Sequence, residues 1–434
     1  MAMAAVGRQL IADELIAAMT QTERAYYILT CIYRIAWAAL GPTYGLFLLD
    51  RGLDLLQLNL VLAIYLITIC LFEVPTGAIA DVFGRKASFL LSCVVRAVAF
   101  ALYFVSDTFL WFVIAEVIDA IGTTLATGAF DAWAVDGVRA DGDRRPADRL
   151  FARGQMVGQA TALFGGLAVA QLAEVDIAYP WLVGSGGFLL CAAVGALLMR
   201  EAAHVADPSE ARPASIRAAI AEGLAIVRAA PLLRRLCVLT ALAAAATMPA
   251  FQMWQPRLAG LSGEGPWLMG WVWAFIGLAS VAGSAAVPRL LPRLGRSRTL
   301  ALALAWRAAT LAVAGAAAGF PLAFTAFILQ EIGFGISEPV LQAWMNDHAT
   351  AARRATVLSI RSMAFTLGGG SGLIALGWLA LHTDIGTAWL VSAAIYAVAA
   401  PLFWRLSAME ARGGTEPADP GSRTQDSGVL IRDA

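Results

Sequence analysis

Long apolar stretches separated by short polar turns follow one another along most of the chain, from residue 26 to residue 405. A helix needs roughly 20 apolar residues to cross the hydrocarbon core of a bilayer, and each stretch is about that long. The pattern predicts an all-α membrane protein with twelve transmembrane helices. The predicted spans are 26–49, 57–80, 88–106, 108–136, 151–174, 178–199, 235–257, 266–290, 299–318, 320–346, 355–380 and 384–405.

An internal repeat divides these spans into two sets of six. Three short segments recur at one constant offset of 211 residues: Gly84-Arg85 as Gly295-Arg296, Arg96-Ala97 as Arg307-Ala308, and Ala132-Trp133 with Asp136 as Ala343-Trp344 with Asp347. Two similar membrane halves joined head to tail are typical of transporters with a central site. We therefore expect one six-helix bundle over 26–199 and a second over 235–405.

Composition supports a membrane protein. The 434 residues are 59% hydrophobic and only 14% charged, with a mean hydropathy of +0.71. Charged residues make up about a quarter of soluble domains. We expect the lipid bilayer as the surroundings of this chain, and no nucleic-acid partner.

Basic residues gather on one side of the predicted spans. Lys and Arg accumulate in cytoplasmic loops, and this rule places both termini, the 85–86 turn and the segment 200–234 in the cytoplasm. All basic residues except Lys86 are arginine, which suits the inner membrane of a GC-rich bacterium.

Three polar segments lie outside the predicted bundles. Residues 1–25 predict a short interfacial helix, and the linker 200–234 contains an amphipathic pattern over 215–227 that predicts a surface helix. Residues 406–434 are rich in Gly, Pro and charges, which predicts a disordered cytoplasmic tail.

The sequence contains no pattern typical of an enzyme. The five cysteines and three histidines have no metal-ligand spacing, and a GxxxxGK[ST] loop is missing. We expect no cofactor and no metal, and transport driven by an ion gradient or by the gradient of the solute.

The turn after the second predicted span carries the most specific motif. Residues 77–86 read GAIADVFGRK, which resembles the G-x-x-x-D-x-x-G-R-[KR] signature of the major facilitator superfamily. This resemblance implies a twelve-helix transporter, usually monomeric, whose motif forms a cytoplasmic gate between the bundles. The motif residues are Gly77, Asp81, Gly84, Arg85 and Lys86, joined by Asp136 at the end of the fourth span.

The second copy of this motif departs from the pattern, with Pro292 at the position of Asp81 and Ser297 at that of Lys86. We therefore expect any latch to depend mainly on the first half. A passive role in a tight turn is the alternative. The fourth span also departs from the R-x-x-Q-G-x-G segment of drug/proton antiporters, because Glu116 replaces its arginine and Asp119 its glutamine.

Charged residues at mid-span are candidates for a substrate and proton pathway, because each is costly in a bilayer. Depth along the helices places three arginines and three acids near one level, which are Arg34, Arg96, Arg307, Glu116, Asp119 and Glu331. The alternative is that these charges form buried structural pairs.

Two groups within this set favour function. Arg34 has no repeat-related counterpart and lies near Tyr33 and Trp37, which suits an anionic or aromatic solute. Glu116 and Asp119 are three residues apart and share a helix face, so one of them could carry a proton. Alternatively, Arg34 or Arg96 holds both acids as salt bridges.

Three more charges suggest gating. Glu73 precedes Pro75, Glu338 precedes Pro339, and Arg361 is a plausible partner of Glu73 across the two bundles. The tryptophans near the outer ends of the seventh and eighth spans, including Trp273, are interpreted as interfacial anchors.

These features favour a secondary transporter that exports small, largely apolar organic or drug-like compounds in exchange for protons. Two alternatives stay open: an importer of a small anionic nutrient, by symport or uniport, and a membrane scaffold that has lost transport.

Overall fold

A computed structural model describes residues 19–38, 40–142, 147–201, 228, 230–347 and 354–407, with the side chains of residues 74, 81, 148, 346 and 354–359 left out. Every regular element within these ranges is a helix. The predicted interfacial helix, the linker helix over 215–227 and the tail after 407 fall outside the described residues, so they stay predictions.

Within the described ranges, eight helices form the first bundle. The first predicted span is divided into two helices around residues 40–43, and the fourth is divided at Gly128, whose φ of 78° ends a helix. The helices are α2 (Gln21–Ala38), α3 (Tyr44–Asp50), α4 (Leu55–Phe83), α5 (Arg85–Val105), α6 (Phe109–Ala126), α7 (Ala129–Ala140), α8 (Ala147–Leu172) and α9 (Tyr179–Leu198).

Six of the described helices form the second bundle. The seventh predicted span is divided at Met253, while the eighth and ninth lie in one 51-residue helix that is interrupted at Gly295. The helices are α11 (Pro231–Gln252), α12 (Trp254–Ser262), α13 (Pro266–Ala316), α14 (Phe320–Asp347), α15 (Arg354–His382) and α16 (Ile385–Trp404).

Gly84 and Gly295 make the sharp turns that the repeat predicts. Their φ angles are 93° and 72°, a region of backbone conformation that glycine adopts without steric cost. Residue 84 joins α4 to α5, and residue 295 joins the two arms of α13. We call the end of the molecule with these turns the Gly84 end, and the end with α3 and α12 the Gly52 end.

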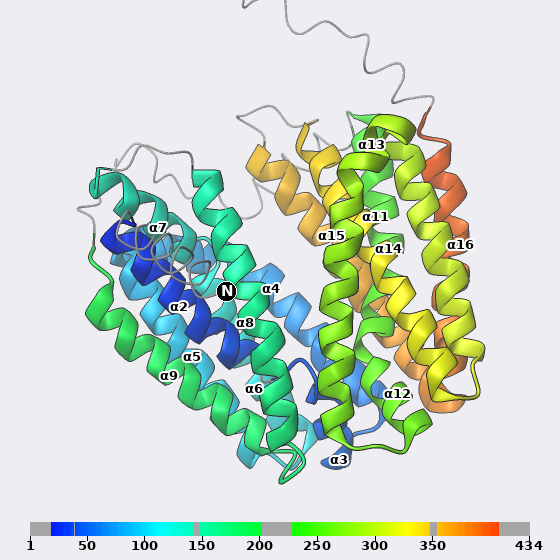
Figure 1. Ribbon diagram of the computed structural model, residues 1–434, viewed down its shortest axis with the longest axis horizontal. Coiled ribbons are helices and arrows are strands. Elements are labelled where there is room, and N and C mark those ends of the chain that lie inside the picture. Colours follow the sequence, from blue (N-terminus) through cyan, green and yellow to red (C-terminus); the bar gives the residue numbers. More distant parts are fainter. Residues whose placement is uncertain are drawn as a thin grey trace, which may run out of the picture.

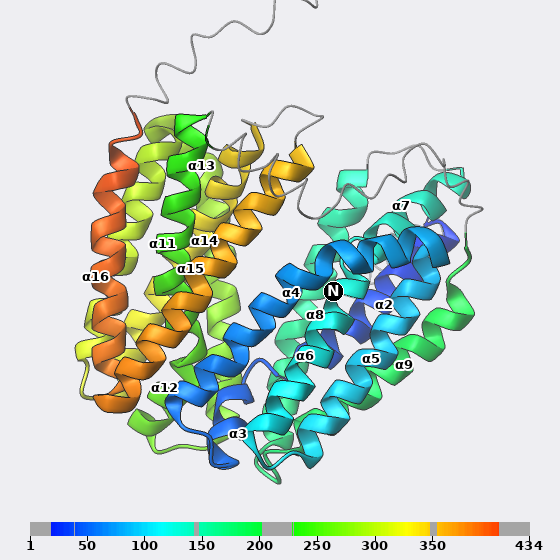
Figure 2. The same cartoon turned by 180° about the vertical axis from the view of Figure 1, so that it is seen from behind.

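The two bundles approach each other at one end of the molecule. Their main contacts place α4 against α15 and α8 against α13. The ribbons lie close together at the Gly52 end and diverge toward the Gly84 end in both views (Figures 1 and 2). The two bundles are therefore in closer contact at the Gly52 end than at the Gly84 end.

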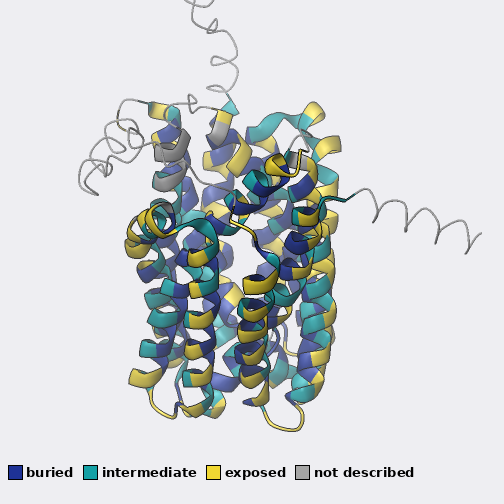
Figure 3. Cartoon of the chain, turned by 90° about the vertical axis from the view of Figure 1, so that its left-hand side faces the viewer, coloured by how far each residue is buried: buried dark blue, intermediate teal, exposed yellow. Residues whose placement is uncertain are grey.

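The outward surface of the helices is apolar, as a lipid-facing surface must be. Large hydrophobic side chains such as Leu197, which is 83% exposed, point away from the bundles, and exposed positions follow the outer helices along their length (Figure 3). Within the described residues, nine helical segments are long and apolar enough to cross a membrane.

Two of the longer described helices of the first bundle, α2 and α8, are missing from that set of nine. Polar residues lower the hydropathy of α2 and α8, among them Arg34 and Gln155. These side chains avoid the lipid because they face a cavity inside the first bundle. The lower hydropathy of α2 and α8 therefore points to this cavity as a candidate site.

Candidate functional site

Two cavities lie on either side of the middle of the first bundle. The larger has a volume of about 590 Å³ and is lined by α2, α5, α6, α7 and α8. The smaller, of about 170 Å³, lies toward the Gly52 end and is lined by both halves of the chain. Trp37 borders both cavities, so the wall between them is thin.

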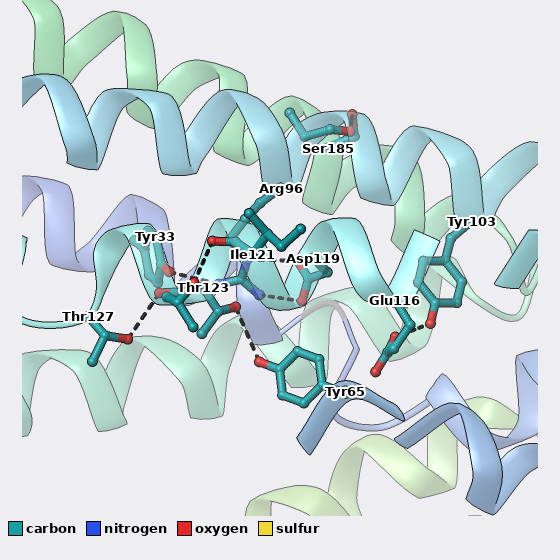
Figure 4. Close-up of polar contacts among 12 residues, drawn as sticks. Tyr33, Tyr65, Arg96, Tyr103, Glu116, Asp119, Ile121, Thr123, Thr127 and Ser185 are labelled. Atoms are coloured by element: carbon teal, nitrogen blue, oxygen red, sulfur yellow. Dashed lines mark hydrogen bonds and ion pairs between the residues drawn. The ribbon is translucent and has the colours of Figure 1, made fainter. Parts of the chain in front are cut away.

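A buried ion pair stands between these cavities. Arg96 on α5 donates from Nε to Asp119 Oδ1 at 2.8 Å and from Nη2 to Oδ2 at 3.2 Å (Figure 4). Arg96 is 2% exposed and Asp119 on α6 is 4% exposed. Arg96 lines the larger cavity and Asp119 lines the smaller one. A change in this pair would therefore alter the lining of both cavities.

The remaining surroundings of Arg96 are aromatic. Its Nη1 donates to Tyr33 Oη at 2.7 Å, and its guanidinium carbon lies 4.4 Å from the ring centre of Phe188. Hydrogen bonds and a π face partly replace the water that the cation loses on burial. Asp119 is nevertheless the only carboxylate that pairs with Arg96 among the described residues.

Stability alone does not explain why this buried pair is charged. Removing two charges from water costs several kcal/mol per ion, and an apolar pair of similar volume is often as stable or more stable. Breaking one partner of a buried pair is in contrast strongly destabilising. The energy of this arrangement thus depends strongly on keeping both charged partners together.

Glu116 lies one helical turn from Asp119 and has a different partner. The Tyr103 hydroxyl donates to its carboxylate, and Tyr44 Oη lies 3.5 Å from Tyr103 Oη. Both acids line the smaller cavity, as their shared helix face predicts. The alternative in which one arginine holds both acids is wrong, because Arg96 holds Asp119 alone.

Arg34 reaches the larger cavity from the opposite wall. Its Nη2 donates to Gln155 Oε1 on α8 at 3.2 Å, and no acid pairs with it within 4 Å in the described part of the chain. Asp131 lines the same cavity and accepts a hydrogen bond from Tyr26 Oη at 3.2 Å. The cavity therefore presents a cation and an anion among aromatic rings.

The second bundle holds a similar buried pair in which a neutral amide replaces the carboxylate. Arg307 donates from Nε to Gln330 Oε1 at 2.6 Å and from Nη2 to Thr247 Oγ1 at 3.2 Å. Its guanidinium carbon lies 4.3 Å from the ring centre of Tyr396. Gln330 occupies the repeat position of Asp119, so the two halves differ by one charge at this place.

Glu331 is close to this network but is not bonded to the arginine. Its Oε1 accepts a hydrogen bond from Gln330 Nε2 at 2.8 Å, and its side chain is buried. The structure thus brings Arg96, Asp119, Glu116, Tyr33 and Trp37 together, and sets Arg307 and Glu331 in a separate cluster of the second bundle.

Hydrogen bonds between the bundles close the Gly52 end. Gln255 on α12 donates from Nε2 to the Gly41 carbonyl at 2.6 Å and accepts from the Gly45 amide. Gln252 on α11 donates to the Leu58 carbonyl at 3.2 Å. These bonds join the first half to the second beside the smaller cavity.

Trp273 fills the space next to these glutamines. Its ring lies so close to Gly41 that a Cβ on this residue would be 2.6 Å away, and its centre is 6.2 Å from that of Trp37. Trp273 also lines the smaller cavity. The interpretation of Trp273 as an anchor in the membrane interface is therefore wrong: its ring packs between the two bundles.

At the Gly84 end the motif residues bond within single bundles. Arg85 contacts Asp136 and donates to the Ala132 carbonyl at 2.9 Å, and Lys86 donates to the Met199 carbonyl at 2.6 Å. The repeat-related Arg296 contacts Asp347. The arginine–aspartate contact is thus present in both halves, although the sequence suggested an asymmetric arrangement.

The other gate candidates have different outcomes. Arg361 pairs with Glu338 within the second bundle, so the expected pairing with the exposed Glu73 is wrong for this conformation. Gly77 lies in the last turns of α4. The side chain of Asp81 is outside the described residues, and its partner stays a prediction.

Several lining residues were missed from the sequence. Tyr65 donates to Thr123 Oγ1 at 3.2 Å beside the buried pair. Gln255 and Gln330 are buried polar residues, and the exposed Asp131 lines the larger cavity. Only Gln330 carried a usable signal, because it follows from Asp119 by the repeat offset. Among the described residues no cluster of His, Cys, Asp or Glu is arranged to hold a metal ion.

Comparison with curated proteins gives two relatives. The uncharacterized MFS-type transporter YxaM of Bacillus subtilis (strain 168) is 26% identical over 158 residues, which is 36% of this chain and 39% of that protein. The multidrug resistance protein MdtH of Shigella boydii serotype 4 (strain Sb227) is 25% identical over 306 residues, covering 70% of this chain and 72% of the relative.

Solved structures share the fold at low identity. The nucleoside transporter NupG (D323A mutant) aligns with a TM-score of 0.76 at 14% identity, covering 89% of this chain and 99% of that one. The D-xylose-proton symporter aligns with a TM-score of 0.66 at 15% identity, covering 89% and 97%. The Major Facilitator Superfamily model matches residues 26–305 and 289–428. The chain belongs to the Major Facilitator Superfamily.

Proposed function

We propose that this chain is a proton-coupled exporter of small, largely apolar aromatic compounds. The observation that carries this proposal is the position of the Arg96–Asp119 pair, with one partner facing each of two cavities. A group placed in this way can exchange a proton on one side while a solute occupies the other. Secondary transporters of this family bind small molecules, and the name of the relative MdtH supports export.

The proposal assigns a topology to the fold. We infer twelve spans, with α2 and α3 forming the first, α6 and α7 the fourth, α11 and α12 the seventh, and the two arms of α13 the eighth and ninth. Both termini and the Gly84 end then lie in the cytoplasm, in agreement with the positive charges at Arg85 and Lys86.

In this topology the conformation is open to the cytoplasm. The larger cavity includes Asp131 of α7 and Gly154 and Gln155 of α8, on the part of these helices that lies toward the Gly84 end. The bonds of Gln255 to Gly41 and Gly45 then close the outer side. Alternating access would require these bonds to break while the Gly84 end closes.

The buried pair provides a reason for coupling. A proton that reaches Asp119 from the smaller, outer cavity removes the negative charge that neutralises Arg96. The guanidinium is then a buried cation without a counter-charge, with the Tyr33 hydroxyl and the rings of Tyr33, Phe100 and Phe188 as partners, a costly state. A solute in the larger cavity can replace the lost partner, because Arg96 lines that cavity. Glu116, beside the same outer cavity, is a second proton acceptor.

The lining of the larger cavity favours a particular class of solute. Its aromatic residues offer flat apolar faces, while Arg34 and Asp131 offer one charge of each sign. Ligand sites of this kind combine an apolar lining with a few placed polar groups. Planar organic compounds with one polar or charged substituent fit this chemistry.

A second candidate is import of a small anion. The observation that favours it is the pairing of Arg34 with a neutral amide, Gln155, which leaves its positive charge to face the cavity. In this alternative, Arg34 and Arg96 would bind the anionic group, and the proton would travel with it.

The test measures substrate-evoked proton movement. The purified chain in liposomes that contain a pH-sensitive dye is exposed to cationic, neutral and anionic aromatic compounds, under an imposed pH gradient of either sign. Wild type is compared with Asp119→Asn and with Asp107→Asn, a control that removes an exposed carboxylate from the turn between α5 and α6.

Export predicts that compounds move opposite to the protons and that Asp107→Asn behaves as wild type. Movement of anions together with protons would support the importer instead. Transport that ignores the pH gradient would refute proton coupling, and no movement of any compound by a folded wild type would favour a scaffold without transport.

A further inference from the structure

The smaller cavity combines acidic and aromatic side chains, and no basic residue lines it. Its two charged lining residues are Glu116 and Asp119. Asp119 is paired with Arg96, which lines the larger cavity and not the smaller one. Glu116 forms no ion pair within 4 Å in the described part of the chain. The smaller cavity therefore holds one carboxylate that no described cation balances.

The hydrogen-bond partners of Glu116 are neutral. The Tyr103 hydroxyl donates to its carboxylate (Figure 4), and Tyr44 Oη lies 3.5 Å from Tyr103 Oη. Because the Tyr103 hydrogen points to Glu116, Tyr44 is the donor in the second bond. Hydrogen bonds to a carboxylate stabilise its ionised form, and so does a neighbouring cation. A cation in the cavity would therefore complete the surroundings of Glu116.

Aromatic rings from both bundles form much of the remaining wall. Trp37, Tyr44 and Tyr65 belong to the first bundle, and Phe251 and Trp273 belong to the second. The ring centres of Trp37 and Trp273 are 6.2 Å apart. Aromatic faces attract cations, and cages of such rings are suited to alkylated ammonium groups. Calcium and magnesium ions instead need about six or more oxygen ligands, so this lining favours an organic cation.

The size of the cavity suits a group of a few heavy atoms. Its volume is about 170 Å³. One water molecule takes up about 30 Å³ in the liquid, so this volume corresponds to roughly five or six groups of that size. A nitrogen with its methyl groups fits this space, whereas a large aromatic compound does not. Because Trp37 borders both cavities, a longer compound could reach past this ring into the larger one.

We propose that the smaller cavity binds an alkylated ammonium group, with Glu116 as its counter-charge and the rings of Trp37 and Trp273 beside its methyl groups. Two sources share this chemistry: a small free cation, and the ammonium end of an exported compound whose planar part lies in the larger cavity. The second source rests on the proposed function, in which the larger cavity holds the solute. Since both bundles line the cavity, the site is complete only where they meet at the Gly52 end.

The test is isothermal titration calorimetry of the full chain in detergent at one fixed pH. The ligands are tetramethylammonium, phenyltrimethylammonium and tert-butanol, a neutral molecule with nearly the shape of tetramethylammonium. Glu116→Gln removes the charge and keeps the length of the side chain, and its control Asp107→Asn removes an exposed carboxylate outside the cavity. Trp37→Leu removes one ring of the wall, and its control Trp111→Leu removes a ring that is 49% exposed on α6.

The proposal predicts that tetramethylammonium binds at least tenfold more tightly than tert-butanol. Glu116→Gln should weaken the binding of both cations about tenfold or more, and Trp37→Leu about threefold or more, while both controls bind as the wild type does. Phenyltrimethylammonium that binds about tenfold more tightly than tetramethylammonium would assign the group to the exported compound. Equal affinities of the two cations would assign the site to a small free cation.

Three results would overturn the proposal: no binding of either cation by the folded wild type, equal affinities for tetramethylammonium and tert-butanol, or wild-type cation binding by Glu116→Gln with its unfolding temperature unchanged. If Glu116→Gln does not fold, wild-type binding by Trp37→Leu overturns it instead. The calorimetry needs no proton movement. A protein that binds the cations but moves no protons in liposomes would therefore refute the proposed coupling and keep this site, and the reverse result would refute the site alone.

Discussion

Asp119 and Gln330 occupy the same position in the two halves of the chain, and each accepts a hydrogen bond from the Nε of a buried arginine. The distances are 2.8 Å and 2.6 Å, so the geometry is preserved while the charge is not. The first half therefore carries an ionisable side chain at this position, and the second half carries a neutral amide. This difference is the basis of the coupling that we propose.

The stability of the pair should depend on both partners together. Asp119→Asn leaves Arg96 as a buried cation without its counter-charge and should lower the free energy of unfolding by about 3–5 kcal/mol. The double variant Arg96→Gln/Asp119→Asn removes both charges and should lose much less. Denaturation in detergent measures both values. Losses that simply add in the double variant would show that the two residues are not energetically coupled.

The closed outer side should depend on Gln255. Gln255→Ala removes two hydrogen bonds between the bundles, at roughly 0.5–1.5 kcal/mol each, and should raise the outward-open population about fivefold or more. In a variant with its five native cysteines replaced, Tyr44→Cys reports the change by labelling with an impermeant maleimide from the outside. Ser262→Ala serves as the control, because the hydrogen bonds of its hydroxyl, with the Ala259 carbonyl and the Glu264 amide, stay within the second half of the chain. Equal labelling with and without Gln255 would argue against this gate.

The motif arginine should affect transport more than stability. Arg85 and Asp136 are partly exposed, with side chains at 26% and 36%, so Arg85→Ala should change the free energy of unfolding by less than about 1 kcal/mol. If the first-half turn is the cytoplasmic gate, the same change should slow transport several-fold. Arg296→Ala is the matched substitution in the second half. A larger transport defect in Arg296→Ala than in Arg85→Ala would contradict the predicted asymmetry.

Asp384 should stabilise the start of α16 in a pH-dependent way. Thr387 donates to its carboxylate from Oγ1 at 2.6 Å and from the backbone amide at 3.2 Å, which lowers the pKa of Asp384 below its ordinary value. The contribution of Asp384 to stability is thus fully present above its pKa in the unfolded chain. It is lost as the pH falls through the lower pKa of Asp384 in the folded protein.

At pH 7, Asp384→Ala should cost roughly 1 kcal/mol, measured by thermal unfolding in detergent, and the difference from wild type should shrink toward pH 3. Asp384→Asn keeps a capping side chain and is the control, because it should lose only the part that depends on charge. A loss that stays constant between pH 7 and pH 3 would contradict this role.

The sequence predicted the helices of the fold better than the partners of the charged residues. Helical rise placed Arg34, Arg96 and Asp119 near one level, and the structure brings the last two together. The position of Arg361 along its helix does not show whether it pairs with Glu73 or with Glu338. The rotation of the helix about its own axis determines which acid the side chain faces. The cross-bundle contacts are long-range, and no local pattern marks them.

For residue types with two common roles, the sequence does not show which role applies. Tryptophan is frequent in membrane interfaces, and this favoured an anchor role for Trp273, yet its ring packs against Gly41 of the other bundle. No sequence pattern marks a neutral amide such as Gln255 as a residue of the bundle interface. Here it joins the two halves, because its side chain can both donate and accept.

The most direct test of the central claim is substrate-evoked proton movement in liposomes that contain Arg96→Gln/Asp119→Asn. This double variant removes both charges of the buried pair together, so its unfolding temperature should stay close to that of the wild type and a loss of fold would not confuse the result. We predict that a compound that drives proton movement through wild type drives none through the double variant. Proton movement at the wild-type rate in this folded double variant would contradict the account.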